Sequence, residues 1–398
     1  MEVDVKGLYP LIALMASVFL FNASEFLPVA LLGSIADDLR VTDFEAGLIV
    51  SFYAWAVALL SLPVMLLLRR MEYKRMLLLC ILVFTACQAL SGISDSYWML
   101  MASRIGVALS HAVFWSIVTP IAVNVVSERH RKTAISCIAV GTCIAMVLGL
   151  PLGRAIGLML SWRWSFLSIS IASLLVLIIL IMILPKVPNP GTFTVKRVPE
   201  IFRSRVLVGI FVVLVLIVTG IFTGYSYIDV FLTDFGGFSE GEVTFLLTVF
   251  GMAGVVGSFM FSKVSRPRMR MFTAAVFLIN TVSMLLLNPS VALLMAACLV
   301  IFLWGFCYIA FSVSLQSVLL TESPEDATPI TMSIYSGLFN VGIASGTLIG
   351  GGVMDSIGVG MIGYVGGAFS ALSTAVLLLF LLPYIDKRMH QSPESGRS

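Results

Sequence analysis

Charged residues are scarce in this sequence. Asp, Glu, Lys and Arg make up only 11% of its 398 residues, whereas soluble globular domains carry roughly 25%. Hydrophobic residues reach 59% and the formal net charge is only +3. This balance excludes a disordered chain, a secreted disulfide scaffold and a nucleic-acid-binding protein. The long apolar runs between the few charges predict an all-α membrane protein.

Motifs for catalysis and metal binding are also scarce. The six cysteines lie inside apolar runs, without CxxC or Cys/His spacing, and therefore predict buried helix residues rather than disulfides or metal ligands. HExxH and GxxxxGK(S/T) do not occur, and the GxSxG match at 237–241 lies in a short connection between apolar runs. These connections are too short for a catalytic domain. We therefore expect no enzymatic activity, no cofactor and no metal.

Twelve apolar runs are each long enough to cross a bilayer. We predict transmembrane helices at 8–34, 44–68, 76–94, 97–126, 133–160, 164–184, 205–232, 243–263, 270–288, 292–320, 329–355 and 360–383. Most Lys and Arg residues lie at the termini and in every second connection, and only Arg40 and Arg163 lie in the opposite loops. Because cytoplasmic loops carry excess Lys and Arg, we expect both termini in the cytoplasm.

The longest connection, 185–204, is rich in proline and basic residues. It predicts a cytoplasmic linker between two six-helix bundles, 1–184 and 205–383, with a cytoplasmic tail at 384–398. Capping-box sequences, Thr42-x-x-Glu45 and Ser239-x-x-Glu242, precede the second and eighth spans. The interval between Thr42 and Ser239 recurs in three other pairs: Gly149 and Gly346, Gly153 and Gly350, and Arg69 and Arg266. Two pseudo-symmetric halves of this kind are typical of transporters.

Seven segments carry motifs that recur in a known family. They are 21–29 (FNASEFLPV), 53–59 (YAWAVAL), 104–108 (RIGVA), 111–117 (HAVFWSI), 145–154 (AMVLGLPLGR), 161–164 (SWRW) and 225–228 (YSYI). They resemble the bacterial sugar efflux transporters in the twelve-span drug–proton antiporter branch of the major facilitator superfamily. The resemblance implies alternating access between two six-helix bundles and a place in the bacterial inner membrane.

The loop after the second span departs from the family pattern. The resemblance places an acidic residue before a basic cluster there, but that position is Arg69, and a glycine is replaced by Glu72. We therefore do not expect the family's charge relay at this loop. A usual glycine in the fourth-span motif is Ala108.

Ionisable residues inside the spans are candidates for proton coupling, because a charge at the bilayer centre costs about 2.5–3.5 kcal/mol. Glu25 and Arg104 lie at comparable depths, about 10–13 Å from one membrane face at ~1.5 Å per residue. Our hypothesis is that they face one cavity and exchange partners with substrate and proton; the alternative is a permanent clamp between two helices. His111 shares a helix stripe with Arg104 and Trp115, where it would bind a hydroxyl or take part in a proton step, or be a core histidine.

Polar and aromatic residues in both halves are candidates for substrate binding. Aromatic faces can stack on a sugar ring, and amides, hydroxyls or imidazoles can bind its hydroxyl groups. Tyr225 and Asp229, and likewise Trp304 and Tyr308, are four residues apart and therefore predicted to share a helix face. The alternatives are core packing and, for Asp229, a solvated position at the mouth. The predicted set is Asn22, Tyr53, His111, Trp115, Tyr225, Asp229, Trp304, Tyr308 and Asn340.

The fifth span carries an antiporter-like motif with Gly149, Pro151, Gly153 and Arg154. Small residues four apart let helix backbones approach closely, and a proline inside a helix removes a hydrogen bond and favours a bend. The motif therefore predicts either tight packing or a rocking contact that seals against proton leak. We expect Arg154 at the outer interface rather than in the substrate site.

Together these features predict a proton-coupled exporter of small sugars or sugar-like compounds. An exporter of another small compound, such as a drug, and an uncoupled facilitator are the alternatives. The expected partners are the substrate, protons and membrane lipids, with no nucleic acid, and we expect the chain to act as a monomer.

Overall fold

The chain is helical almost throughout. A computed structural model describes residues 5–68, 70–127, 131–187, 198–264, 268–323 and 328–383, and these ranges contain no strand. Twelve of their helices are long and apolar enough to span a membrane, which confirms the predicted all-α membrane fold. The tail 384–398, the middle of the linker (188–197), Arg69 and Arg266 lie outside the described residues.

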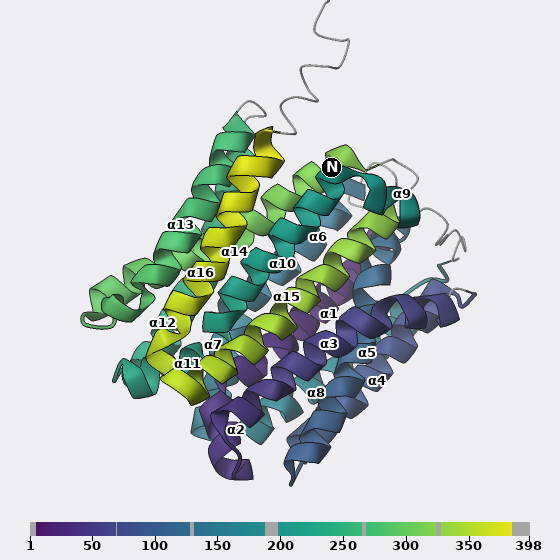
Figure 1. Cartoon of the computed structure of the whole chain (residues 1–398). Coiled ribbons are helices and arrows are strands. Elements are labelled where there is room, and N and C mark those ends of the chain that lie inside the picture. The colour runs from purple at the N-terminus through teal and green to yellow at the C-terminus, as the bar shows by residue number, and fades with distance from the viewer. Residues whose placement is uncertain are drawn as a thin grey trace, which may run out of the picture. The chain divides into compact units, whose positions relative to one another are not determined.

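The spanning helices follow the predicted order (Figure 1). The first six are α1 (Val5–Ala30), α3 (Asp43–Leu68), α4 (Tyr73–Gly92), α5 (Tyr97–Asn124), the run α6–η2–α7 (Arg131–Ile144, Ala145–Gly149, Leu150–Met159) and α8 (Trp162–Ile183). The last six are α10 (Arg205–Tyr225), α12 (Glu240–Lys263), α13 (Met269–Ser290), α14 (Leu294–Glu322), α15 (Thr328–Ile357) and the run α16–η7 (Ile362–Val376, Leu377–Leu381). Short elements connect them: α2 (Leu32–Leu39), α9 (Val198–Arg203), α11 (Ile228–Val230), η4 (Phe231–Phe235) and η6 (Val359–Met361).

The helices form two compact units. Unit 1 comprises Met1–Phe193 and Ser226–Gly251, and unit 2 comprises Thr194–Tyr225 and Met252–Ser398. In unit 1, α4 packs against α5 and α8, and α3 packs against α5; in unit 2, α10 packs against α15 and α16, and α13 packs against α14 and α16. This division differs from the bundles predicted from sequence by placing 226–251 with the first unit.

The first span ends earlier than predicted. We expected one helix over 8–34, but α1 ends at Ala30, and Leu31 leaves the helical conformation at φ −129° and ψ 17°. Pro28 lies three residues before this break. Because proline has no N–H and its ring displaces the carbonyl four residues earlier, it weakens the helix at this point.

The seventh span is also shorter than predicted. The expected helix over 205–232 is wrong, since α10 ends at Tyr225 and α11 begins only at Ile228. Between them Tyr227 adopts φ −120° and ψ 18°, and its side chain is completely buried. A Cβ added to Gly47 of α3 would overlap the Tyr227 ring, so this glycine makes room for the ring inside unit 1.

The repeated sequence signals correspond to repeated structure. The Thr42 backbone N–H donates to the Glu45 carboxylate at 2.8 Å, and the Ser239 N–H donates to Glu242 at 2.8 Å. Each serine or threonine hydroxyl accepts the return bond from the backbone of its glutamate. The two predicted capping boxes are therefore confirmed at the starts of α3 and α12.

Two glycine rows, Gly149 with Gly153 and Gly346 with Gly350, lie at equivalent places in the two halves of the sequence and let helix pairs approach closely. A Cβ on Gly153 of α7 would overlap Leu27 of α1, and a Cβ on Gly346 of α15 would lie 2.5 Å from the Thr219 carbonyl oxygen of α10. The rows thus pack the fifth helix on the first and the eleventh on the seventh. A π-helical segment, η2, lies directly before α7, whose first turn contains Pro151.

We expect Gly346→Ala to destabilise the protein by about 1–3 kcal/mol, because the new methyl group would press on a backbone carbonyl that cannot rotate away. Gly352→Ala is the matched control in the same helix, since its Cβ would meet nothing within 4 Å. Thermal unfolding in detergent measures both. Equal melting temperatures for the two variants would contradict this account of the glycine row.

Candidate functional site

Arg104 is held inside unit 1 by neutral oxygen atoms of α1. Its side chain is 1% exposed, and it donates to the hydroxyl of Ser24 at 3.1 Å and to the carbonyl of Ser24 at 3.0 Å. Pro28, four residues further along α1, cannot donate the helical hydrogen bond to that carbonyl. The arginine therefore replaces the bond that proline removes. Its guanidinium carbon also lies 4.8 Å from the ring centre of Tyr53.

Glu25 faces His111 across the contact between α1 and α5. The carboxylate Oε2 lies 3.5 Å from His111 Nε2. The same imidazole nitrogen accepts a hydrogen bond of 2.7 Å from the indole N–H of Trp115, one turn further along α5. The Tyr53 ring meets His111 edge-on, with 5.7 Å between ring centres.

The structure thus brings the predicted first-half residues together but assigns different partners. Glu25, Tyr53, Arg104, His111 and Trp115 form one cluster. The ion-pair contact recorded for Glu25 is with His111, and the hydrogen bonds recorded for Arg104 go to Ser24. A direct hydrogen-bonded clamp between Glu25 and Arg104 is therefore not the arrangement that this structure adopts.

Three buried polar atoms of this cluster have no hydrogen-bond partner within the described part of the chain. They are the Tyr53 hydroxyl, His111 Nδ1 and Arg104 Nε, on residues that are at most 3% exposed. Buried polar groups in proteins are normally hydrogen-bonded. The cluster therefore presents donors to an oxygen-bearing ligand or to water.

Asn22 lies one turn before Glu25 on α1 and packs towards α6. Its amide donates to the Val18 carbonyl at 2.9 Å and lies 3.5 Å from the Thr142 hydroxyl. Its amide N–H groups are thus directed to protein oxygens in this structure.

The aromatic candidates of the second half also form a cluster, inside unit 2. Tyr225 and Tyr308 are parallel, with 6.5 Å between ring centres, and Trp304 stands edge-on to Tyr225 at 6.1 Å. Asn340 donates to the Ser336 carbonyl at 3.0 Å, and its own carbonyl oxygen is buried without a hydrogen-bond partner among the described residues. The predicted shared face of Trp304 and Tyr308 is consistent with these contacts.

Asp229 belongs to unit 1, whereas this second cluster belongs to unit 2. The prediction that it shares a helix face with Tyr225 is wrong, because α10 ends at Tyr225. Asp229 instead forms a buried ion pair with Arg154 of α7, and Arg154 also binds Glu240 and the carbonyl of Ala30. Burial raises the pKa of the Asp229 carboxyl to about 6, while the guanidinium of Arg154 acts in the opposite direction.

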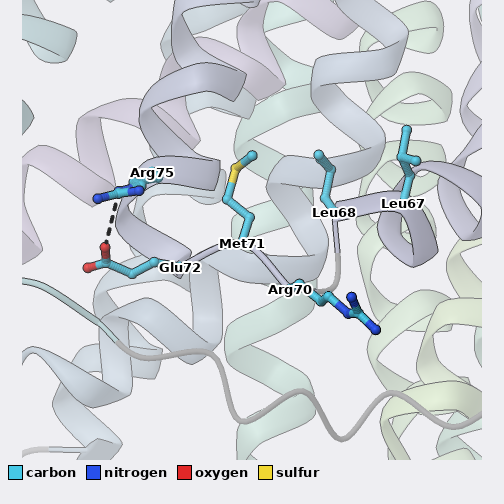
Figure 2. A pocket seen from close by; sticks show the side chains of 6 residues that line it. All are labelled: Leu67, Leu68, Arg70, Met71, Glu72 and Arg75. Carbon is cyan, nitrogen blue, oxygen red and sulfur yellow. Dashed lines mark ion pairs between the residues drawn. The ribbon is translucent and has the colours of Figure 1, made fainter.

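A separate hollow lies at the connection between α3 and α4 (Figure 2). It measures about 630 Å³ and is lined by Leu67, Leu68, Arg70, Met71, Glu72 and Arg75. Arg75 pairs with Glu72 at 3.6 Å, and Figure 2 shows the Arg70 side chain directed away from this pair. The hollow contains none of the ionisable residues predicted inside the spans.

Sequence reasoning missed three polar partners in unit 1. Ser24 accepts hydrogen bonds from Arg104, and its hydroxyl also accepts one from the Gln88 amide. Pro28, four residues after Ser24, was the available signal of a free carbonyl. Glu240, the acidic residue in the first turn of α12, was missed as a partner of Arg154.

Comparison with known proteins identifies the family. A model of the Major Facilitator Superfamily matches residues 12–331. The chain belongs to this superfamily. Among curated relatives, a probable sugar efflux transporter of Helicobacter pylori is 39% identical over 369 residues, covering 93% of each chain. One of Mannheimia succiniciproducens is 36% identical over 376 residues, covering 94% of each.

Solved structures of superfamily members share the fold. An inward-facing, unoccupied bacterial homologue of the human lysosomal transporter Spinster has a TM-score of 0.72 at 16% identity, covering 96% of both chains. The human organic anion transporter MFSD10 has a TM-score of 0.71 at 15% identity, covering 94% of this chain and 100% of that one. Both support a multi-pass membrane transporter fold.

We expect Arg154→Met to destabilise the protein by about 3–5 kcal/mol, because it leaves the buried Asp229 carboxylate unpaired. Asp229→Asn should cost less, since Glu240 and the Ala30 carbonyl still bind the arginine, and the double variant should recover part of the loss of Arg154→Met. Arg75→Met removes a pair at 3.6 Å whose arginine is 78% exposed and is the control, with an effect of about 0–1 kcal/mol. Thermal unfolding in detergent at neutral pH tests this order, and strictly additive losses would contradict the pairing.

Proposed function

We propose that this chain exports small sugars or sugar-like compounds from a bacterial cell in exchange for protons. The family membership and the names of relatives at 36–39% identity support export of a small solute. The relatives match over more than nine-tenths of both chains, so the proposal concerns the whole chain rather than one segment of it.

The charge distribution supports a place in the inner membrane with both termini in the cytoplasm. Arg70, Lys74 and Arg75 flank the connection from α3 to α4, and Arg268 and Arg270 lie at the start of α13. Cytoplasmic connections carry an excess of such residues. Both of these connections therefore belong on the cytoplasmic side.

The contact between Glu25 and His111 is the main observation in support of Glu25 as the residue that binds the transported proton. Antiport needs a group that gains a proton on one side and loses it on the other. Glu25 is a carboxylate inside a spanning helix, where an ionisable side chain is a functional candidate by default. Because Arg104 donates two hydrogen bonds to Ser24, Glu25 can change its protonation while these two bonds stay in place.

The remaining polar and aromatic groups suit a polyhydroxylated ligand. Within unit 1 the candidates for binding hydroxyl groups are the Tyr53 hydroxyl and His111 Nδ1. Within unit 2, taken by itself, the candidates are the rings of Tyr225, Trp304 and Tyr308 and the carbonyl of Asn340. Aromatic walls with a few polar groups are typical of small-molecule sites. Alternating access would let these groups meet the substrate from either side of the membrane.

We expect cells that make this chain to release preloaded labelled sugar faster than cells without it, and a protonophore to abolish the difference. Glu25→Gln should reduce efflux to the background rate while the protein still inserts, because the amide cannot carry a proton. Glu45→Gln is the matched control, since glutamine also completes a capping box, and it should transport normally.

The alternatives give different results in the same assay. Chain-dependent sugar efflux that is unaffected by the protonophore would indicate a facilitator. Absence of sugar efflux, with the protein inserted, would indicate another exported compound. Normal coupled efflux by Glu25→Gln would reject the role of Glu25.

A further inference from the structure

The hydrogen bond between Trp115 and His111 fixes which imidazole nitrogen carries a proton. An indole nitrogen can only donate, and it lies 2.7 Å from His111 Nε2. Nε2 must therefore be the acceptor. In a neutral imidazole with a free lone pair on Nε2, the proton lies on Nδ1.

This tautomer constrains Glu25. Its Oε2 lies 3.5 Å from the same Nε2 atom. The single lone pair of Nε2 already accepts the indole N–H. An ionised carboxylate would place its negative charge beside this electron-rich nitrogen, with no imidazole N–H to bind, and an imidazolium would direct its N–H at the indole N–H. A protonated, neutral Glu25 beside Nε2 is the arrangement without such repulsion. The geometry thus fits a neutral Glu25 beside a neutral His111.

Few other ionisable groups face this pair. Tyr53 on α3 and Arg104 on α5 are electrostatically close to Glu25, and Cys87 on α4 is close to Arg104. Among the described side chains of the other elements that pack against α1, the ionisable ones are Cys137 on α6, exposed Asp37 and Asp38 on α2, Asp229 on α11, Arg154 on α7 and Arg163 on α8. Arg154 binds Asp229 and Glu240, and Arg163 binds Asp38. His111 is therefore the titratable group placed to respond to the proton on Glu25.

We propose that Trp115 is a positioning residue that keeps His111 Nε2 unprotonated, so that this conformation of unit 1 holds the proton on Glu25. The inference rests on the proposed function and adds a mechanism to it. Loss of the proton from Glu25 to water leaves a carboxylate beside the electron-rich Nε2, and this repulsion favours departure from the conformation. Proton occupancy and conformation are thereby linked at one pair of atoms.

Trp115→Phe tests the proposal because it removes the donor N–H and keeps an aromatic ring. Nε2 is then free to bind a proton, and an imidazolium beside Glu25 would stabilise the carboxylate. The readout is a pH titration of the purified protein by infrared spectroscopy, following the protonated-carboxyl band that Glu25→Gln removes. We expect the midpoint to move to lower pH by about one unit or more. Trp98→Phe, at an exposed position, is the matched control and should leave the midpoint unchanged.

A second substitution tests whether the shift of the midpoint in Trp115→Phe is caused by an imidazolium at His111. In Trp115→Phe combined with His111→Gln no imidazolium can form, so the shift should disappear. An unchanged midpoint in Trp115→Phe, an equal shift in Trp98→Phe, or a wild-type protein without a band that depends on Glu25 would each overturn the proposal.

Nitrogen NMR of histidine-labelled wild-type protein tests the same claim without relying on a variant that folds. The chain has three histidines, and His111→Gln assigns the resonances of His111. We expect a protonated Nδ1 and an unprotonated Nε2; the opposite tautomer or an imidazolium at neutral pH would contradict the proposal. Because neither spectroscopic measurement involves transport, these outcomes stand apart from the sugar efflux assay, and the positioning role can fail while coupled export holds, or the reverse.

Discussion

The buried charge of Arg104 determines how the candidate site is built. A guanidinium inside a bundle of apolar helices costs free energy unless polar groups compensate its burial. Here Ser24 provides a hydroxyl and a backbone carbonyl, and the carbonyl is available because Pro28 cannot bind it. Gln88 binds the same hydroxyl. These bonds join α1 to α4 and α5 at the position of Ser24.

Glu25 follows Ser24 directly, so the same anchor sets the position of the carboxylate. The ion-pair contact of Glu25 is with His111, and Arg104 acts on Glu25 electrostatically while its hydrogen bonds go to Ser24. Arg104 can keep its bonds to Ser24 while Glu25 gains or loses a proton. In this interpretation the arginine is structural and electrostatic, and the Glu25–His111–Trp115 group responds to the proton.

Local patterns explain which features could be predicted. The twelve spans, the two capping boxes and the glycine rows depend on residues a few positions apart, and each is present. The breaks after Ala30 and Tyr225 were not predicted. The first lies close to Pro28, whereas the second depends on the fit of Tyr227 against Gly47, which is far away in sequence. Helical spacing placed Glu25 and Arg104 at similar depths, but depth alone did not show that the adjacent Ser24 would bind the arginine.

Proton movement driven by a sugar gradient tests the central claim of coupled export most directly. Purified protein in liposomes, with a pH-sensitive dye inside, would receive a sugar gradient of either direction without an imposed pH gradient. The account predicts that protons move opposite to the sugar and that their direction reverses with the gradient. Sugar movement through the protein with no accompanying change in internal pH would contradict it.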